Sequence, residues 1–571
     1  MRTTGITLLI GTLLLGGCAS VSPTSSQQSG IDTDYQPGQP VYTPGELNRE
    51  SLYELMAAEI AGQRRNFDTA LDYYLSQVRK SRDPAVAERA TRIAQFMRNP
   101  DAVLEAATVW SEVSPDNPEP DHIRATILIS EERFDEALPV LERILDDGSS
   151  EAVLILGSKS QELTADSAKR YDELLSRYSE RDPERLDLLL TRALLKRRAG
   201  DDDGALALLD QGLATEPGQT DLLLQKIDIL RTRGQQQAAL SLIDEGLDAS
   251  PNQSQLRVQK AQLLIATDPD TAVELIDDVI ADQPDESQLH YYFALLTLEH
   301  EQYAASRRIL EQMAEKDPHN SNLNFYLGVI DEAEGNTESA LQHFLEVRSG
   351  PNLPQAYSHA VELFNSPDDR AQVAAIIDQG IERHPGLNSR LQLTEANWLH
   401  THGLETEALS LLENALKREP ADVGLLYTYA LLVEKQDPEK MLANLERAIE
   451  LDPDNGMLQN ALGYSLTVYS DDYDRAHDLI SKALEQHPDD AAVLDSMGWV
   501  LFKLGREAEA LNFLQRAYDA SGDPEVASHL IEVLWQQGET EQARQLLQEN
   551  LDATPEDEHL NEIAEKLGVD Q

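Results

Sequence analysis

Residues 494–524 read LDSMGWVLFKLGREAEALNFLQRAYDASGDP, and this stretch decides the fold. Apolar and small residues recur at helical spacing in its first half, and Gly505 interrupts that pattern. A second amphipathic segment runs from about Glu507 to Ala520. Pro524 ends the unit, because proline cannot continue a helix but suits the first turn of the next one. The stretch therefore predicts a hairpin of two antiparallel helices.

Small residues in this stretch lie where the two predicted helices cross. Gly498 on the first helix and Ala510 on the second allow the two backbones to approach closely. A bulky side chain at either place would push the helices apart. The pattern predicts a tightly packed hairpin rather than two independent helices.

Prolines repeat along the chain with a period of 33 to 35 residues. The regular series is Pro183, Pro217, Pro251, Pro284, Pro318, Pro351, Pro385, Pro420, Pro453 and Pro488. Pro84 and Pro118 are also 34 residues apart, and Pro524 and Pro555 extend the series less evenly. Such a period predicts a repeat protein, in which each hairpin buries its apolar face by stacking on the next.

The units resemble the tetratricopeptide repeat, a 34-residue helical hairpin with small residues at three set positions. Gly498, Ala510 and Ala517 match those positions. The resemblance covers about residues 50 to 560, or roughly fifteen units. It implies an all-α fold, a tetratricopeptide-repeat superhelix, which is an α-solenoid of helical hairpins.

The regularity of the repeats differs along the body of the chain. We expect degenerate helical repeats over residues 46–180 and regular tetratricopeptide repeats over residues 181–571. A more polar helix at about residues 556–567 is expected to cap the C-terminal end. Glycine and proline therefore mark hairpin turns rather than linkers between domains.

The N-terminus predicts export and lipidation. Arg2 precedes a short apolar run, Gly5–Gly17, which is followed by Cys18, the only cysteine in 571 residues. This order is typical of a secretory signal peptide, and the run is too short to span a bilayer comfortably. The LLGGC motif that ends at Cys18 resembles the lipobox of bacterial lipoproteins. The resemblance implies a signal peptide over residues 1–17 and attachment of acyl chains such as palmitate at Cys18.

Residues 18–45 are expected to form a lipidated, flexible tether. They are rich in Ser, Gln, Pro and Gly and cannot bury enough apolar surface to fold. A coil of this length spans roughly 30 Å on average. Ala19 stands where an Asp would resemble an inner-membrane retention signal. The resemblance therefore implies an outer-membrane protein whose body faces the periplasm of a Gram-negative bacterium.

The net charge of the chain argues against some classes of binding partner. The chain has 102 acidic and 47 basic residues, a net charge of −55. Such acidity argues against binding nucleic acid, because phosphates would be repelled. It also disfavours contact between the protein body as a whole and an anionic membrane.

The sequence contains no constellation typical of an enzyme. It has no nucleophile elbow, phosphate-binding loop or dinucleotide fingerprint. The HEQYA segment at residues 300–304 lacks the second histidine of a zinc-protease motif, and His400 and His402 have no further ligand nearby. We therefore expect no catalytic residues, no metal site and no cofactor.

The remaining candidate is a protein-binding wall. By the resemblance, certain positions of each first helix face the inner groove of the superhelix. The residues at such positions in the C-terminal units are Asn460, Tyr464, Asp495, Trp499, Phe502 and Trp535. In one interpretation the aromatic residues anchor a peptide or protein, Asn460 and Asp495 provide hydrogen bonds, and Asp495 favours a basic partner. In the other, the aromatic residues pack against the neighbouring unit.

Further motifs resemble a more specific family. The lipobox, the tether, RDPAVAERATRIA at residues 82–94, NALGY at 460–464 and DSMGWVLFKLG at 495–505 resemble proteobacterial tetratricopeptide lipoproteins. One type is the outer-membrane adaptor of a periplasmic carboxyl-terminal processing protease. The resemblance implies a scaffold that brings the protease and its cell-wall hydrolase substrates together. The alternative is a structural component of polysaccharide export or outer-membrane biogenesis.

Overall fold

The computed structural model describes residues 49–145 and 151–568. The predicted signal peptide, the lipid site at Cys18 and the tether lie outside these residues. The chain divides into two compact units, Met1–Ala305 and Ser306–Gln571, a division that the repeat period does not indicate. All regular elements in the described ranges are helices, so the fold is all-α, as predicted.

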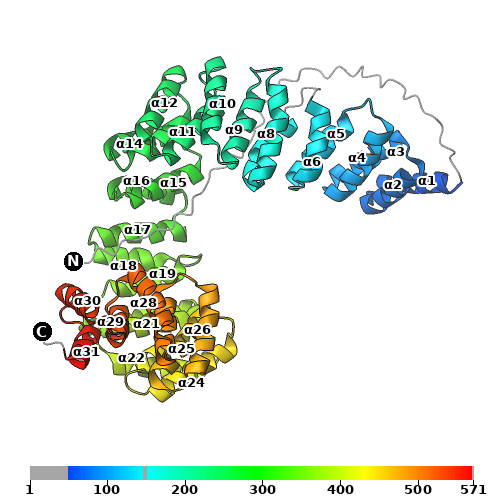
Figure 1. Ribbon diagram of the computed structural model, residues 1–571. Helices are drawn as coiled ribbons and strands as arrows, with labels where there is room; N and C mark the ends of the chain where they lie inside the picture. The colour runs from blue at the N-terminus through cyan, green and yellow to red at the C-terminus, as the bar shows by residue number, and fades with distance from the viewer. Residues whose placement is uncertain (1–48, 146–150, 569–571) are drawn as a thin grey trace. The chain divides into compact units, whose positions relative to one another are not determined.

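In unit 1 (Met1–Ala305), antiparallel hairpins stack side by side (Figure 1). Its helices are α1 (Arg49–Gln63), α2 (Phe67–Ser81), α3 (Pro84–Phe96), α4 (Pro100–Val113), α5 (Glu119–Ser130), α6 (Phe134–Ile144), α7 (Glu151–Ser158), α8 (Ala165–Ser179), α9 (Leu186–Arg198), α10 (Asp202–Thr215), α11 (Thr220–Thr232), α12 (Gln236–Ala249), α13 (Ser254–Leu264), α14 (Pro269–Asp282) and α15 (Ser287–Glu299), with a 3-10 turn η2 (Ser160–Glu162). The unit boundary falls within α16 (Tyr303–Lys316).

Unit 2 (Ser306–Gln571) continues the pattern. Its helices after α16 are α17 (Ser321–Ala333), α18 (Thr337–Glu346), α19 (Leu353–Glu362), α20 (Arg370–Arg383), α21 (Asn388–Thr401), α22 (Glu405–Arg418), α23 (Val423–Val433), α24 (Pro438–Leu451), α25 (Gly456–Tyr469), α26 (Tyr473–Gln486), α27 (Ala491–Lys503), α28 (Glu507–Ser521), α29 (Pro524–Gln536), α30 (Thr540–Ala553) and α31 (Glu558–Leu567), with 3-10 turns η3 (Pro367–Asp369) and η4 (Pro385–Leu387). No helix in the described part of the chain is both long and apolar enough to cross a bilayer.

The hairpin α27–α28 has the boundaries that its sequence predicts. The Asp490 side chain accepts a hydrogen bond from the Val493 N–H and caps α27. Gly505 follows α27 with φ +75°, a conformation that glycine adopts without steric cost. Pro524 is the first residue of α29, and the Asp523 side chain caps that helix through the Glu525 N–H. Asp caps and proline starts thus place each turn where the repeat needs it.

The two helices of this hairpin touch at the small residues. A Cβ atom added to Gly498 would lie 2.5 Å from Cγ of Leu514, closer than van der Waals contact allows. Ala510 and Ala517 on α28 are completely buried. Gly463 on α25 has the same relation to Ile480 on α26, at 2.6 Å. The predicted close crossing is therefore confirmed.

One extra residue separates the small positions of α25–α26 from those of α27–α28. Gly463 and Ala476 are 13 residues apart, whereas Gly498 and Ala510 are 12 apart. The repeat pattern suggests a longer turn, but the structure places the extra residue in α25, which has 14 residues against 13 in α27. The helix absorbs the insertion because its last residue, Tyr469, lies at the surface, 40% exposed.

A histidine links three helices in the first part of unit 2. The Nδ1 atom of His359 on α19 lies 2.8 Å from Oε2 of Glu332 on α17. Its ring stacks on Phe344 of α18, with centroids 5.1 Å apart. Burial alone lowers the pKa of His359, but the hydrogen bond and charge of Glu332, with the charge of Glu362, outweigh burial and raise that pKa above 6.5.

We expect Gly498→Val to destabilise the α27–α28 hairpin by about 1–3 kcal/mol, because the new side chain overlaps Leu514. Hydrogen exchange of the α27 and α28 amides measures this free energy of opening. Gly386→Ala is the control, since no atom lies within 4 Å of its added Cβ. A Gly498→Val protein with wild-type protection would contradict the close crossing.

We expect His359 to stabilise unit 2 at low pH. Because its folded pKa is raised, the stabilisation is fully present below about pH 6.5 and is lost as the pH rises through the folded value. The measurement is the urea midpoint of wild type minus that of His359→Gln between pH 5.5 and 8.5. The difference should shrink with rising pH; a constant or growing difference would show that the pair with Glu332 has no role in stability.

Candidate functional site

Three polar side chains lie in the first halves of successive first helices of unit 2. They are Asn460 on α25, Asp495 on α27 and His529 on α29, spaced 35 and 34 residues apart. Asp495 is 6% and His529 8% exposed. Because the repeat brings equivalent positions side by side, residues far apart in sequence become neighbours here.

Asp495 and His529 form a buried pair. Nδ1 of His529 lies 3.0 Å from both carboxylate oxygens of Asp495. Trp499, one turn along α27 and only 7% exposed, stacks on the His529 ring with centroids 4.0 Å apart and planes 18° apart. The pair therefore joins α27 to α29 through a hydrogen bond and a stacked ring.

A cation covers the other aromatic surface of α27. Trp499 and Phe502 stack with centroids 5.3 Å apart. Nζ of Lys503 lies 4.3 Å from the Trp499 ring centre and 5.8 Å from that of Phe502. Burial lowers the pKa of Lys503, while the charge of Glu532 opposes that shift. A partly desolvated cation over an aromatic face gains electrostatic energy that a hydrated one would not.

Tyr464 and Asn460 have different surroundings. The Tyr464 hydroxyl donates to Oε1 of Glu525 on α29, and burial, followed by that carboxylate, raises the pKa of Tyr464. Oδ1 of Asn460 is buried and has no hydrogen-bond partner among the described residues. Leaving a buried acceptor unpaired costs free energy. A partner that donates a hydrogen bond to this oxygen would recover that cost.

Two further contacts lie near the end of the repeat. Trp535 is partly buried under the guanidinium of Arg544, whose Cζ lies 5.2 Å from the ring centre. Nζ of Lys435, just after α23, lies 3.0 Å from Oε2 of Glu558 in α31. The last pair joins residues 123 apart in sequence, although both side chains are exposed and such pairs contribute little stability.

The predicted binding residues thus fall into two groups. Trp499 and Asp495 are nearly inaccessible and engage the next unit, as the packing interpretation expects. Asn460, Tyr464, Phe502 and Trp535 are only partly buried. Sequence reasoning missed His529 and Lys503. The repeat register does not indicate His529, because the helix caps Asp490 and Asp523 are 33 residues apart and align Asp495 with Ser528.

An open depression of about 370 Å³ lies between α19 and α21, first helices of two successive hairpins. Trp398 of α21 and His402, directly after that helix, form one part of its wall, with ring centroids 4.2 Å apart. The Trp398 indole N–H donates to the Phe364 carbonyl, at 2.7 Å, and fixes the ring. The side chains of Asn365 and Asn397 also line the depression, and both are exposed.

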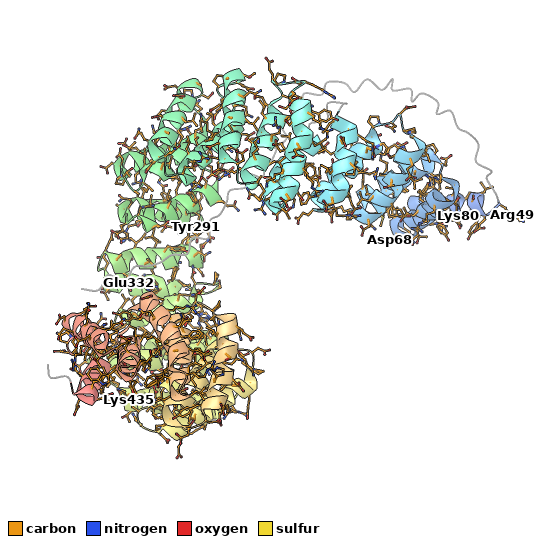
Figure 2. The ribbon with its side chains drawn as sticks, in the orientation of Figure 1. Arg49, Asp68, Lys80, Tyr291, Glu332 and Lys435 are labelled. Carbon is orange, nitrogen blue, oxygen red and sulfur yellow. The ribbon has the colours of Figure 1, made fainter. Side chains whose placement is uncertain are left out.

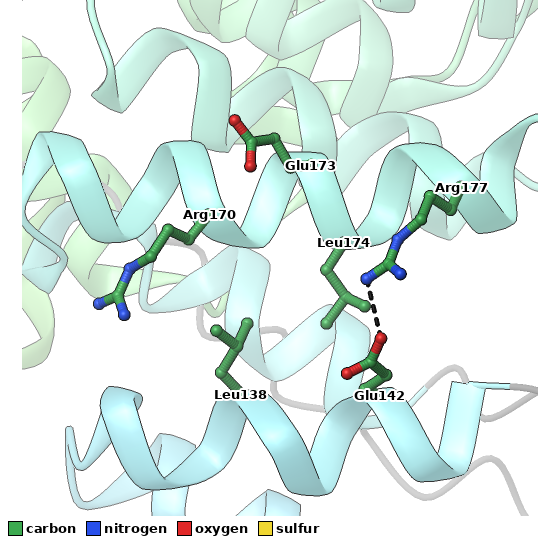
Figure 3. Close-up of a pocket in the computed structure, with 6 residues that line it drawn as sticks. All are labelled: Leu138, Glu142, Arg170, Glu173, Leu174 and Arg177. Carbon is green, nitrogen blue, oxygen red and sulfur yellow. Dashed lines mark hydrogen bonds and ion pairs between the residues drawn. The ribbon is translucent and has the colours of Figure 1, made fainter.

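Unit 1 contains a shallower depression of about 400 Å³ between α6 and α8 (Figure 3). Leu138 of α6 and Leu174 of α8 face each other in it. Arg177 pairs with Glu142 at 2.9 Å across one end. Two glutamates and two arginines line this depression, so its net charge is close to zero.

The described ranges contain no group of three or more His, Asp or Glu side chains that could hold a metal ion. The two histidines at the turn after α21 do not converge: His402 stacks on Trp398, and His400 is exposed. What this part of the molecule offers chemically is hydrogen bonding and stacking.

We expect Trp499→Ala to destabilise the α27–α29 contact by about 3 kcal/mol, because the ring is buried against His529. Hydrogen exchange of the α27 and α29 amides reports this change. Trp535→Ala, which removes a partly exposed ring, should cost much less. Unchanged protection in Trp499→Ala would show that the ring is not part of the core.

Comparisons with known proteins agree with this architecture. Tetratricopeptide-repeat family models match residues 190–254 and 293–354, residues 470–521, and residues 501–567. The TPR repeat-containing protein PA4667 of Pseudomonas aeruginosa is 32% identical over 571 aligned positions, which span 92% of this chain and 90% of the relative.

Solved structures with similar folds superpose only loosely. Yeast Tom70 is 16% identical, with 92% of this chain and all of that chain covered and a TM-score of 0.30. TTC0263, a thermophilic TPR protein of Thermus thermophilus, is 25% identical, with 31% of this chain and 98% of that chain covered and a TM-score of 0.28. Superpositions this loose carry no argument about function. The identity to PA4667 over nearly the whole length, with the hairpins described above, shows that this chain belongs to the tetratricopeptide-repeat proteins.

Proposed function

We propose that this protein is a non-enzymatic adaptor, anchored in the outer membrane through Cys18, that binds partner proteins in the periplasm. Tetratricopeptide repeats form extended surfaces that bind other proteins, which supports the scaffold role. The lipobox and tether support the location, and the motif resemblance supports a processing protease and its cell-wall hydrolase substrates as partners.

The observation that carries the adaptor role is the depression between α19 and α21. The amides of Asn365 and Asn397 form no side-chain hydrogen bond within the described residues, and both amides border the depression. Each amide offers a donor and an acceptor, the pair that a peptide backbone needs. The Trp398 and His402 rings beside them provide a flat apolar surface. An extended segment of a partner protein fits these groups.

Charge elsewhere in unit 2 favours a neutral or basic partner. Glu434 and Glu525 both lie close enough to Tyr469 to raise its pKa, after burial as the larger cause. The Tyr464 hydroxyl donates to the same Glu525. Acidic groups beside partly exposed tyrosines attract cationic side chains and repel acidic ones.

Anchoring gives such an adaptor its effect. Two proteins held on one tethered array meet at an effective concentration that can reach the millimolar range. The chemistry then belongs to the bound protease, and the rate gain comes from proximity. A soluble form would still bind both partners but would not concentrate them at the membrane.

We expect the double variant Asn365→Ala/Asn397→Ala to capture its partners at least about tenfold less well, because it removes the free amides without disturbing packing. The full-length lipidated protein is purified from envelopes, and co-purifying proteins are identified and quantified by mass spectrometry. A serine protease and cell-wall hydrolases are the expected partners.

Asn444→Ala is the matched control, since this partly exposed asparagine lies on α24, a second helix. It should capture partners as wild type does. Recovery of export or porin-assembly proteins instead of hydrolases would replace the protease adaptor with an assembly role. Equal capture by the double variant would move the binding surface away from α19 and α21.

A further inference from the structure

The first described helix, α1, exposes an apolar face. Leu52, Tyr53, Met56 and Ile60 are 53%, 66%, 57% and 46% exposed. Their spacing places them on one side of the helix. Large apolar side chains gathered on one exposed face mark an interaction surface more often than isolated ones do.

Glu54 of α1 points the opposite way, toward α2. The Glu54 carboxylate accepts hydrogen bonds from Ser76, Gln77 and Lys80 of α2, at 2.8, 2.6 and 2.8 Å. These bonds, with that of Lys80 the strongest, lower the pKa of Glu54 to about 2. Figure 2 shows Lys80 close to α1. The helix is therefore held to α2 by its acidic side, and its apolar side faces outward.

Glu59 reinforces this orientation. The hydroxyl of Tyr74 on α2 donates to Oε1 of Glu59, and burial, followed by this hydrogen bond, raises the pKa of Tyr74 to about 12. Ala58 of α1 is completely buried against the same hairpin. Rotating α1 to hide its apolar face would break these contacts, so the exposure is built into the packing.

Arginines lie at both ends of the apolar face. Helical spacing places Arg49 at one end of it and Arg64, just after α1, at the other. Both arginines are exposed and form no ion pair with another described residue. In a chain with a net charge of −55, two exposed arginines without ion pairs at the ends of an apolar face are a local exception, although the half-exposed Glu59 lies beside Leu52. Its chemistry suits a surface that is apolar inside and carries phosphate groups outside.

Chain length points to the same surface. Thirty residues separate Cys18 from Arg49, the first residue of α1. The tether predicted from the sequence would span roughly 30 Å on average. A lipid at Cys18 therefore keeps α1 within reach of the bilayer. Figure 2 shows Arg49 at the start of α1.

We propose that the outer face of α1 lies on the phospholipid surface to which the chain is tethered. Leu52, Met56 and Ile60 enter the boundary between headgroups and acyl chains, Tyr53 lies at headgroup level, and Arg49 and Arg64 bind lipid phosphates. A second copy of the chain fits less well, because pairing two such faces would bring the unpaired arginines of both copies together. The proposal rests on the membrane anchor proposed above.

The test uses the full-length lipidated protein in vesicles of phosphatidylethanolamine and phosphatidylglycerol. Acylation consumes the thiol of Cys18, the only cysteine, so Met56→Cys provides a unique site for a spin label. Asp166→Cys on α8 is the control position, where the native side chain is 94% exposed. We expect a water-soluble relaxation agent to reach label 56 about fivefold less than label 166, because only label 56 enters the interface.

A second variant separates the apolar contact from tethering. Leu52→Ser/Ile60→Ser in the Met56→Cys chain should return label 56 to water, whereas Leu431→Ser, an exposed leucine on α23, should not. Equal access at positions 56 and 166, on protein that stays with the vesicles, overturns the α1 contact and leaves the anchor intact. An unmodified Cys18 on protein that leaves the vesicles overturns both. Shielding of label 56 only after envelope proteins are added would assign the face to a protein and contradict the proposal.

Discussion

The close crossing of two helices at small residues is the constraint on which the rest of the structure depends. Gly498 against Leu514 and Gly463 against Ile480 leave no room for a β-carbon. Because the backbones approach this closely, each second helix can bury its own small residues, such as Ala517. A hairpin of fixed geometry results, and identical geometry lets hairpins stack without limit. Length here comes from repetition rather than from a larger core.

Stacking also determines what kind of site the protein can form. In such an array, equivalent positions of successive units lie side by side, so a site is a row of side chains rather than a closed pocket. The Asp495–His529 pair shows one outcome, in which neighbours in the row satisfy each other. Asn365 and Asn397 show the other, in which the groups remain free for a ligand. The same architecture therefore provides both cohesion and recognition.

The fold could be predicted from the sequence because its cause is local and periodic. Proline spacing, Gly505 and the small residues fix the hairpin, and each of them acts within a few residues. The candidate site was harder to predict from the sequence. Helical periodicity indicates on which face of its helix Trp499 lies, but it does not indicate which residue of the next unit packs against that face. The repeat register aligns Asp495 with Ser528, so only the structure shows that His529 lies beside Asp495. The free amides near Trp398 belong to two successive units, and no motif joins them.

The two outermost described helices follow opposite rules, and this contrast has a physical reason. A solenoid needs polar outer faces on its terminal helices to remain soluble. Helix α31 has such a polar outer face, because Leu560 and Ile563 are buried while Glu562 and Glu565 are exposed. Helix α1 does the reverse, with its acids bound to α2 and its leucine, methionine and isoleucine in water. Contact with a bilayer would remove those side chains from water between two exposed arginines, Arg49 and Arg64. It would leave the acidic first-helix surface of unit 2 free to bind proteins, so that attachment and recognition use chemically distinct surfaces of one chain.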